Sequence, residues 1–534
     1  MPEVSLYADT VSRTGDKDEL RSALRSAPML TIVGHPNVAR IGERIALPQL
    51  THDEGVLELS RATPVFQDVT GEDTEPLACV FLSRKPVMLR SARTGIEIDT
   101  SGTRIKVHIA GTEVVGTMTL AHAVVHMGVV LRVGDEVVLL LSWGEHPIMN
   151  APPRHGILGD SAAIVRVRSE ISRIASDMGP VLIRGETGSG KELIARAIHD
   201  ASPRSDGPYV PVNMAAIPST LAAAEFFGHT KNAFSGAGSA RQGYFGQSDT
   251  GSLFLDEVGD TPMDVQALML RAIDQGEVQP LGSEDARKID VRVIAATDAD
   301  LATKAREGLF RPPLYYRLAS HEIHNPPLRE RRDDVARLLV GFLVEEMARR
   351  GRESELATEP DAMEGWLSGA IIERLVDYPW PGNVRQLRNV CRYLAGVEGR
   401  PAITDPGLNR LLDDAINDVG RMQTPTPATE DSGAHEVTPS KRAPADIQGS
   451  ELEEVLKSVD YRLTVAAKLL GISRPSLNRL VDAHPTLVRA QKLTKELLEK
   501  AFAEHEGDIE SLWRALQVGK RSLQLRLREL GIAS

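Results

Sequence analysis

Residues 185–191, in the middle of the chain, have the types and spacing that would bind a polyphosphate. Glycines let a backbone wrap around phosphate groups with its N–H groups pointing inward, and a lysine adds a positive charge. The next residue is Glu192, where a serine or threonine hydroxyl would usually bind Mg²⁺. The candidate ATP-binding residues in this stretch are Gly185, Glu186, Thr187, Gly188, Ser189, Gly190, Lys191 and Glu192.

The segments on both sides of this loop fit the same chemistry. Val181, Leu182 and Ile183 form an apolar run that is typical of a buried parallel strand. From Lys191 to His199 the apolar residues recur with helical spacing. The start of a helix carries the positive end of its dipole, which favours a phosphate group. The sequence therefore predicts a strand, a phosphate-binding loop and a helix in that order.

Carboxylates that could serve hydrolysis follow a second apolar run, at residues 253–255. Asp256 would hold Mg²⁺, directly or through water, and Glu257 would polarise the attacking water. Two further predicted strands end in polar residues, one at Asn213 and one at Thr297 and Asp298. A polar side chain at the tip of this last strand would sense the γ-phosphate.

Three arginines that follow could act on the same phosphates. Arginine stabilises the charge of a transferring phosphoryl group and is often supplied by a neighbouring subunit. Arg311 and Arg317 are the candidates for that role. Arg385 would reach the nucleotide from a C-terminal helical lid.

Length and composition limit the possible classes of protein. The 534 residues favour three or more domains, and 42% hydrophobic residues are ordinary for a globular chain. A net charge of −12 argues against binding of nucleic acid by the whole surface, so any such contact must be local. Two distant cysteines, Cys79 and Cys391, argue against a disulfide framework and a zinc site. With no signal region and no stretch of transmembrane length, we expect a cytoplasmic protein without a membrane partner.

Changes in composition along the chain predict a multidomain organisation. We expect a flexible arm at 1–27, an all-β sandwich at 28–145, a linker at 146–155, an α/β ATPase domain at 156–400 with a helical lid from about 326, a partly disordered linker at 401–450, and an all-α region at 451–534.

The β-region is predicted from short apolar runs separated by turn residues: MLTIV, CVFL, VMLR, GIEID, IKVHIA, VVLRVG and EVVLLL. It resembles forkhead-associated (FHA) domains in divergent form, through Gly42, Ser83-Arg84, Thr100 to Thr103, Ala110-Gly111 and Gly134-Asp135. FHA domains bind phosphothreonine, which would make Arg44, Ser83 and Arg84 the phosphopeptide-binding residues.

Two departures keep an alternative open for this domain. Gly-Glu-Arg stands where the family has Gly-Arg, and Pro86 stands where a histidine would support the loop. The alternative is a sandwich that docks on its own ATPase domain as a regulatory lid. A phosphothreonine protein or a cognate kinase is a partner only under the first interpretation.

The C-terminal region contains a repeat, LTVAAKLLGISRPSLNRLVD and IESLWRALQVGKRSLQLRLREL. Two short helices joined by a tight turn, with a polar and basic second helix, are typical of a helix-turn-helix. Each copy resembles the Fis-type DNA-binding domain, so that two tandem units are expected; a plain helical dimerisation domain is the alternative. The candidate DNA-binding residues are Arg474, Ser476, Asn478, Arg479, Lys520, Arg521 and Gln524.

Residues 156–400 as a whole resemble the AAA+ ATPase domain of bacterial enhancer-binding proteins, the activators of sigma-54 RNA polymerase. The resemblance lies in GETGSGKE, LFLDE, FR-x-x-LYYRL and WPGNVRQLRN. It implies ATP and Mg²⁺ as cofactors and assembly of dimers into a hexameric ring. It also implies that Arg311 and Arg317 act on the neighbouring subunit and that Asn213 controls the reach of Glu257.

The family also carries a surface loop, with the consensus GAFTGA, that contacts the sigma factor. Here the loop consists of Asn232, Ala233, Phe234, Ser235, Gly236 and Ala237. Asparagine in the first position tolerates a left-handed backbone better than most residues do. Met214, Asp298 and Pro313 also depart from the usual residues, and Asp298 would place a negative charge near the γ-phosphate.

The sequence therefore predicts an ATP-driven transcription activator that binds upstream double-stranded DNA and remodels sigma-54 RNA polymerase. The alternative is a DNA-binding regulator without motor activity, whose ATPase controls oligomerisation only. A replication or repair AAA+ protein is disfavoured, because proteins of that kind do not carry the insertion that begins at Asn232.

Overall fold

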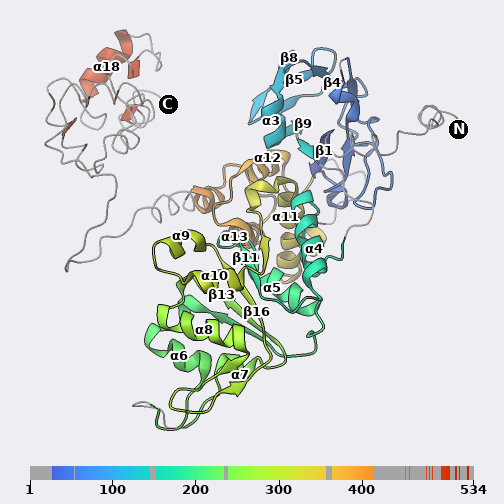
Figure 1. The fold of residues 1–534 in the computed structure, drawn as a ribbon. Coiled ribbons are helices and arrows are strands. Elements are labelled where there is room, and N and C mark those ends of the chain that lie inside the picture. Colours follow the sequence, from blue (N-terminus) through green and yellow to red (C-terminus); the bar gives the residue numbers. More distant parts are fainter. Residues whose placement is uncertain are drawn as a thin grey trace. The chain divides into compact units, whose positions relative to one another are not determined.

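The computed structural model describes residues 27–52, 54–144, 152–233, 239–356 and 364–413, together with separate residues and one helix between 452 and 527. The chain forms two compact units, Met1–Pro425 and Thr426–Ser534. The first contains a β-sandwich, an α/β domain and a helical lid (Figure 1). The predicted arm at 1–27 lies outside the described residues except for Ala27.

Two antiparallel sheets form the sandwich, as predicted for the N-terminal region. The first has the strand order β2-β1-β10-β9-β6-β7 and the second β3-β4-β5-β8. The elements are β1 (Ala27–Gly34), η1 (Val38–Arg40), β2 (Arg44–Ala46), η2 (Pro48–Thr51), β3 (Val56–Leu59), β4 (Val87–Ala92), β5 (Gly95–Asp99), β6 (Val107–Ile109), β7 (Thr112–Glu113), β8 (Thr117–Ala121), α3 (His122–Met127), β9 (Val129–Val133) and β10 (Val137–Gly144).

One predicted strand of this region, CVFL at 79–82, is wrong, since the segment forms a turn. The backbone just before it is held by side chains instead of a strand ladder. Arg40 donates hydrogen bonds to the carbonyl groups of Glu75, Pro76 and Leu77, and His35 lies 3.1 Å from the carbonyl oxygen of Leu77. These bonds satisfy carbonyl groups that a neighbouring strand would otherwise bind.

Strand β10 is buried on both faces. Val137, Leu139 and Leu141 belong to the core between the two sheets, whereas Val138 and Leu140 belong to a second core that includes lid residues. Successive side chains of a strand point to opposite faces, so a strand between two cores is apolar throughout. The uninterrupted run in EVVLLL has this cause.

The α/β domain is built on a parallel sheet with the strand order β12-β13-β16-β11-β17 (Figure 1). Its elements are α4 (Ala162–Ile174), β11 (Val181–Arg184), α5 (Lys191–Asp200), β12 (Tyr209–Asn213), η3 (Met214–Ala216), α6 (Ser219–Phe227), α7 (Tyr244–Gln247), β13 (Ser252–Asp256), η4 (Val258–Asp260), α8 (Met263–Gln275), β14 (Glu277–Val278), β15 (Arg287–Lys288), β16 (Arg292–Thr297), α9 (Leu301–Arg306), α10 (Pro312–Leu318) and β17 (His321–His324). The predicted strand, phosphate-binding loop and helix are β11, residues 185–190 and α5.

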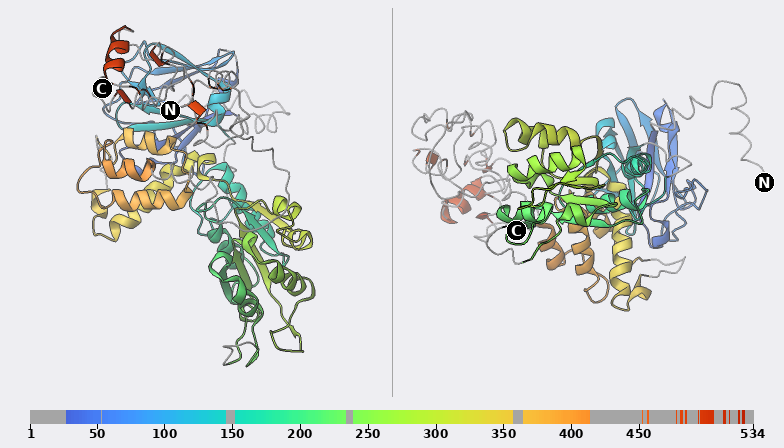
Figure 2. Two further views of the ribbon diagram at one scale, coloured as in Figure 1. Left: turned by 90° about the vertical axis from the view of Figure 1, so that its left-hand side faces the viewer. Right: turned by 60° about the horizontal axis from the view of Figure 1, so that its bottom comes forward.

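Helices form the lid, which lies against the sandwich (Figure 2). They are η5 (Leu328–Glu330), α11 (Arg332–Ala348), η6 (Glu353–Glu355), α12 (Gly369–Asp377) and α13 (Asn383–Leu394). Residues 406–413 are helical as well, and Leu408 and Leu412 are fully buried in the lid core. The lid thus continues to at least Asp413, past the predicted boundary at 400, because these two leucines complete its core.

In the second unit the structure describes helix α18 (Lys495–Glu504) and a small apolar core. Leu512 and Trp513, which the repeat predicts to be helical, are helical and buried in that core. The candidate DNA-binding residues named above all lie outside the described residues. Among the described helices, none has the length and apolar character needed to span a membrane.

Candidate nucleotide site

The phosphate-binding loop has a backbone that glycine makes possible. Gly188 has φ +76° and Gly190 has φ +107°, a region that other residues rarely adopt. A Cβ added to Gly190 would meet no atom within 4 Å, so the space in front of this residue is open. Lys191 directly follows as the first residue of α5. The loop and the helix start together fit a bound phosphate group.

Lys191 is 6% exposed and is held inside the site by two acceptors. Its Nζ donates to the carbonyl oxygen of Gly185 at 2.9 Å and lies 3.3 Å from Oε1 of Glu257. The candidate phosphate-binding cation and the candidate catalytic base are therefore paired with each other. A phosphate group at the loop would compete with Glu257 for Lys191.

Carboxylates gather at the tips of β13 and β16, where Glu257 lies beside Asp256 and Asp298. Oε2 of Glu257 accepts a hydrogen bond from the backbone N–H of Asp298 at 3.3 Å. Burial raises the pKa of Glu257; the Lys191 charge lowers it, and the Asp298 and Asp256 charges raise it. Thr187 of the phosphate-binding loop donates from Oγ1 to Asp298 at 2.6 Å. Asp298 thus contacts both the loop and the backbone next to Glu257.

Two predicted site residues use their side chains for local turns. Thr297 is 1% exposed, and its Oγ1 accepts from the N–H of Ala299 at 3.0 Å. Oδ1 of Asn213 accepts from the N–H of Ala215 at 2.9 Å and caps η3. The structure brings Asp298 to the phosphate-binding loop, and among the described contacts neither Thr297 nor Asn213 reaches Glu257.

The lid contacts the loop through a residue that the sequence analysis missed, Asn383. It is fully buried with φ +51°, its Nδ2 donates to the carbonyl oxygen of Thr187 at 3.2 Å, and its Oδ1 accepts from the N–H of Leu328 at 2.8 Å. The N–H of Arg385 donates to the carbonyl oxygen of Gly188 at 3.2 Å. The first turn of α13 therefore lies directly on the phosphate-binding loop. The Pro-Gly-Asn turn before that helix is the signal in the sequence.

Glu186 is the second link between lid and loop. Its carboxylate receives two hydrogen bonds from Arg329, at 2.6 and 2.8 Å, and one from Nδ2 of Asn383 at 3.1 Å. The Arg329 hydrogen bond holds the pKa of Glu186 below its usual value, so the group stays ionised. Glu192, the neighbour of Lys191, is exposed.

Comparison with known proteins agrees with this geometry. Residues 157–324 match the Sigma-54 interaction domain, and residues 329–418 match the AAA+ ATPase lid domain. The DNA-binding transcriptional regulator NtrC of Klebsiella pneumoniae is 38% identical over 387 residues, which cover 72% of each chain. The chain belongs to the sigma-54-dependent transcriptional activators. The central domain of this activator is an AAA+ ATPase domain.

Other relatives match a smaller share of this chain. Regulatory protein LuxO of Vibrio cholerae serotype O1 is 37% identical over 338 residues, or 61% of this chain and 60% of LuxO. The crystal structure of NtrX from Brucella abortus in complex with ADP is 27% identical with a TM-score of 0.41, and the match covers 61% of this chain and 69% of NtrX.

Two arginines, Arg311 and Arg317, are predicted to act on a neighbouring subunit. Among the described contacts, neither side chain binds the phosphate-binding loop of its own chain. Nε of Arg311 donates to the carbonyl oxygen of Met263 at 3.2 Å. Arg317 pairs with Asp274 at 2.8 Å, and both of these side chains are nearly half exposed. An exposed ion pair is weak, so Arg317 is free to exchange partners.

The base of the predicted sigma-factor loop is described, and its tip is not. His229 and Arg241 are bonded to each other through their backbones at 3.0 Å in both directions. Asn232 has φ +65°, the left-handed conformation that asparagine tolerates. Ala233 follows it. Phe234, Ser235, Gly236 and Ala237 lie outside the described residues.

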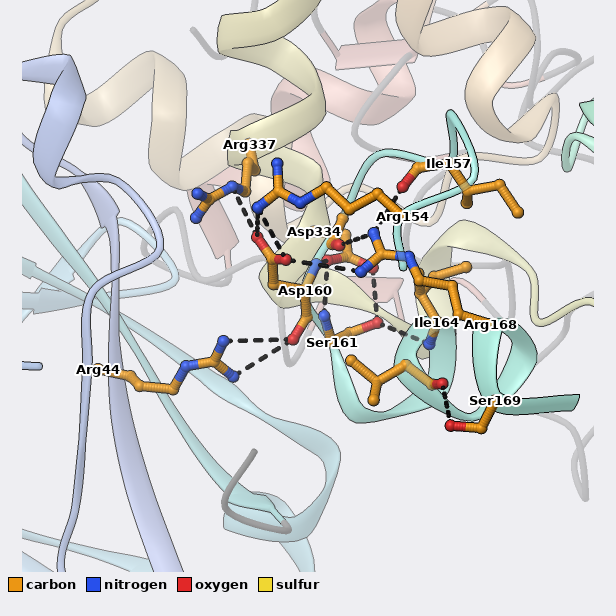
Figure 3. Close-up of polar contacts among 12 residues, drawn as sticks. Arg44, Arg154, Ile157, Asp160, Ser161, Ile164, Arg168, Ser169, Asp334 and Arg337 are labelled. Carbon is orange, nitrogen blue, oxygen red and sulfur yellow. Dashed lines mark hydrogen bonds and ion pairs between the residues drawn. The ribbon is translucent and has the colours of Figure 1, made fainter. Parts of the chain in front are cut away.

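The three candidate phosphopeptide residues of the activator differ in their surroundings. Arg44 is 4% exposed, and both of its terminal nitrogens donate to the carbonyl oxygen of Asp160 at 3.3 Å (Figure 3). Oγ of Ser83 accepts from the N–H of Lys85 at 3.0 Å, and Arg84 is exposed. Arg44 is therefore occupied at the boundary with the ATPase domain.

Proposed function

We propose that this chain is an ATP-driven activator that opens promoters by remodelling sigma-54 RNA polymerase. The observation that carries the proposal is the joint presence of the Lys191–Glu257 site and a sigma-54 interaction domain around it. The relatives that match over most of their length are transcriptional regulators, and NtrC is described as DNA-binding. Binding of upstream double-stranded DNA through residues 451–534 is part of the proposal.

The proposed reaction uses residues that the structure brings together. Lys191 leaves Glu257 and binds the β- and γ-phosphates of ATP. Glu257, released from that pair, takes a proton from the attacking water. Asp256 would hold Mg²⁺, and water would take the place of the hydroxyl that Glu192 does not supply, since Mg²⁺ readily keeps several waters. The chemistry that such an ion would supply is neutralisation of the charge on the phosphates.

Assembly supplies the remaining groups. Dimers of the chain would assemble into a ring of up to six subunits. In this ring, Arg311 and Arg317 would contact the nucleotide of the neighbouring subunit. Arg385 would contact the nucleotide of its own subunit from α13, whose first turn already touches Gly188. Hydrolysis would then move the loop around Phe234, and this movement would act on the sigma factor.

The decisive experiment mixes the purified chain with sigma-54 and an ATP transition-state mimic. We expect a nucleotide-dependent complex that Phe234→Ala removes without loss of ATP hydrolysis. Lys231→Ala is the control, because it changes an exposed side chain beside the same loop. A change at the nearby Phe245 would not serve, since that side chain is buried. Absence of a complex in the presence of normal hydrolysis would favour the regulator without motor activity.

For the sandwich we propose a regulatory role. Its phosphothreonine-binding interpretation rests on the resemblance to FHA domains and on the exposed Arg84 beside Ser83. Loss of phosphopeptide binding in Ser83→Ala and Arg84→Ala would support it. The burial of Arg44 against Asp160 favours the alternative, a sandwich that acts on its own ATPase domain.

A further inference from the structure

The start of helix α11 contacts the sandwich and the phosphate-binding loop through adjacent residues. Arg331, the residue before the helix, is 3% exposed and donates from Nη2 to the carbonyl oxygen of Ser189 at 3.1 Å. Arg332, the first residue of the helix, donates to the carbonyl oxygens of Gly128 at 2.7 Å and Met127 at 3.2 Å. One helical turn thus connects α3 of the sandwich with the loop that would hold phosphate.

The same turn fixes the chain segment that enters the ATPase domain (Figure 3). Asp334 is 1% exposed and accepts hydrogen bonds from the N–H groups of Asp160 and Ser161, at 2.6 and 2.8 Å, and from Oγ of Ser161 at 2.6 Å. One turn later, Nε of Arg337 lies 2.8 Å from Oδ2 of Asp160. Because Arg44 of β2 binds the carbonyl oxygen of the same Asp160, three parts of the chain meet at this residue.

An ion pair joins sandwich and lid at a second place. Nε of Arg132, on β9, lies 2.8 Å from Oε2 of Glu373, on α12, and their side chains are 12% and 8% exposed. The N–H of Gly111 donates to Oε1 of Glu373 at 2.8 Å. A carboxylate buried to this extent depends on its partners, so reversal of either charge would leave two like charges close together.

Apolar packing fills the space between the two polar junctions. Val33, Val130, Val138 and Leu140 of the sandwich share one core with α11 and α12. A cavity of only about 30 Å³ remains there, lined by residues that include Val33, Leu339 and Ile372. Interiors packed in this way transmit displacements instead of absorbing them.

We propose that the sandwich and the lid move as one body, and that docking of the sandwich raises the affinity of the phosphate-binding loop for adenine nucleotide through Arg331. The docked lid is the one whose Arg331 and Asn383 already contact the loop. A site held in its binding geometry loses less freedom when the ligand arrives, so it binds more tightly. The coupling is reciprocal: bound nucleotide must strengthen docking by the same factor.

This inference rests on nucleotide binding at Lys191, which the unmodified full-length chain tests in the same titration. The test compares Arg132→Glu, Glu373→Arg and the double variant with both changes. Nucleotide affinity is measured with a fluorescent ADP analogue, and docking is measured as protection of β10 and α11 amides from hydrogen exchange.

Each single variant should lose protection of these amides and bind the analogue about fivefold or more weakly, the lower end of typical coupling between sites. The double variant restores opposite charges and should recover part of both docking and affinity, since the N–H of Gly111 still lacks its acceptor. Loss of protection with unchanged or higher affinity would overturn the proposal.

A double-mutant cycle tests the route through Arg331. Arg331→Ala should weaken nucleotide binding while β10 remains protected from exchange. Glu373→Arg added to Arg331→Ala should then weaken binding little further, because the contact that transmits docking is already absent. Additive losses of affinity would show that docking acts by another route and would overturn the role of Arg331.

Discussion

The two faces of the lid differ in their apolar packing. Toward the phosphate-binding loop the described contacts are polar, and they include the bonds of Asn383, Arg331 and the N–H of Arg385 to loop carbonyls. Toward the sandwich an apolar core surrounds Val138 and Leu140, in addition to the polar contacts of Arg332 and Glu373. Polar contacts exchange readily with nucleotide or water, whereas parting an apolar core exposes its whole area. We therefore expect lid movements during the ATPase cycle to occur at the loop.

The largest effect is expected from a substitution on the apolar face of the lid, the face toward the sandwich. Leu140→Ala removes a side chain that is 2% exposed, and should lower the free energy of unfolding by about 2–5 kcal/mol. Urea unfolding measures this loss. Leu139→Ala is the matched control, since its side chain points into the sandwich core instead. Only Leu140→Ala should expose α11 and α12 amides to exchange, and equal exposure in both variants would contradict the assignment of the two faces.

The contacts between the lid and the phosphate-binding loop should contribute less free energy than the apolar core does. Asn383→Ala tests this expectation. The change removes hydrogen bonds to Thr187, Glu186 and Leu328 and should weaken nucleotide binding by about 1–3 kcal/mol, which corresponds to about 5- to 150-fold in affinity. Alanine at φ +51° adds backbone strain. Asn383→Gly relieves the strain but lacks the bonds, so it should bind nucleotide nearly as weakly as Asn383→Ala. Recovery of affinity in the glycine variant would assign the effect to strain.

The smallest effect is expected from Asp298→Asn, which touches neither face of the lid. The negative charge of Asp298 contributes to the raised pKa of Glu257. Its removal lowers that pKa, so Glu257 stays ionised to lower pH and the acid limb of ATP hydrolysis moves to lower pH. The pH profile of kcat/KM measures the shift. An acid limb that stays in place, or that moves to higher pH, would show that Glu257 is not the group that titrates.

The features that the sequence predicts well are those encoded in one short stretch. The loop before Lys191 and the strand before Asp256 each carry their own apolar run and polar ending. Contacts between distant segments could not be predicted in this way, because nothing near Ser189 specifies Arg331 and nothing near Thr187 specifies Asn383.

Differences between the prediction and the structure have the same origin. Thr297 and Asp298 are adjacent polar residues, and only the path of the backbone decides which of them faces the phosphate-binding loop. The helix at 406–413 lies beyond the predicted lid boundary, in a stretch that the sequence predicts to be only partly disordered, because its two leucines acquire a core only when the lid has formed. By contrast, the unbroken run in β10 already carried the signal of a strand with two buried faces.

That strand also bears on how the ATPase domain can be handled in isolation. Without residues 27–144, the lid would present Ala336, Leu339 and Ile372 to water, and all three are at most 6% exposed in the full chain. Contiguous apolar surface of this kind promotes self-association. A shortened protein would therefore tend to form aggregates or artificial oligomers, and its state of assembly would report on the missing domain more than on the ring.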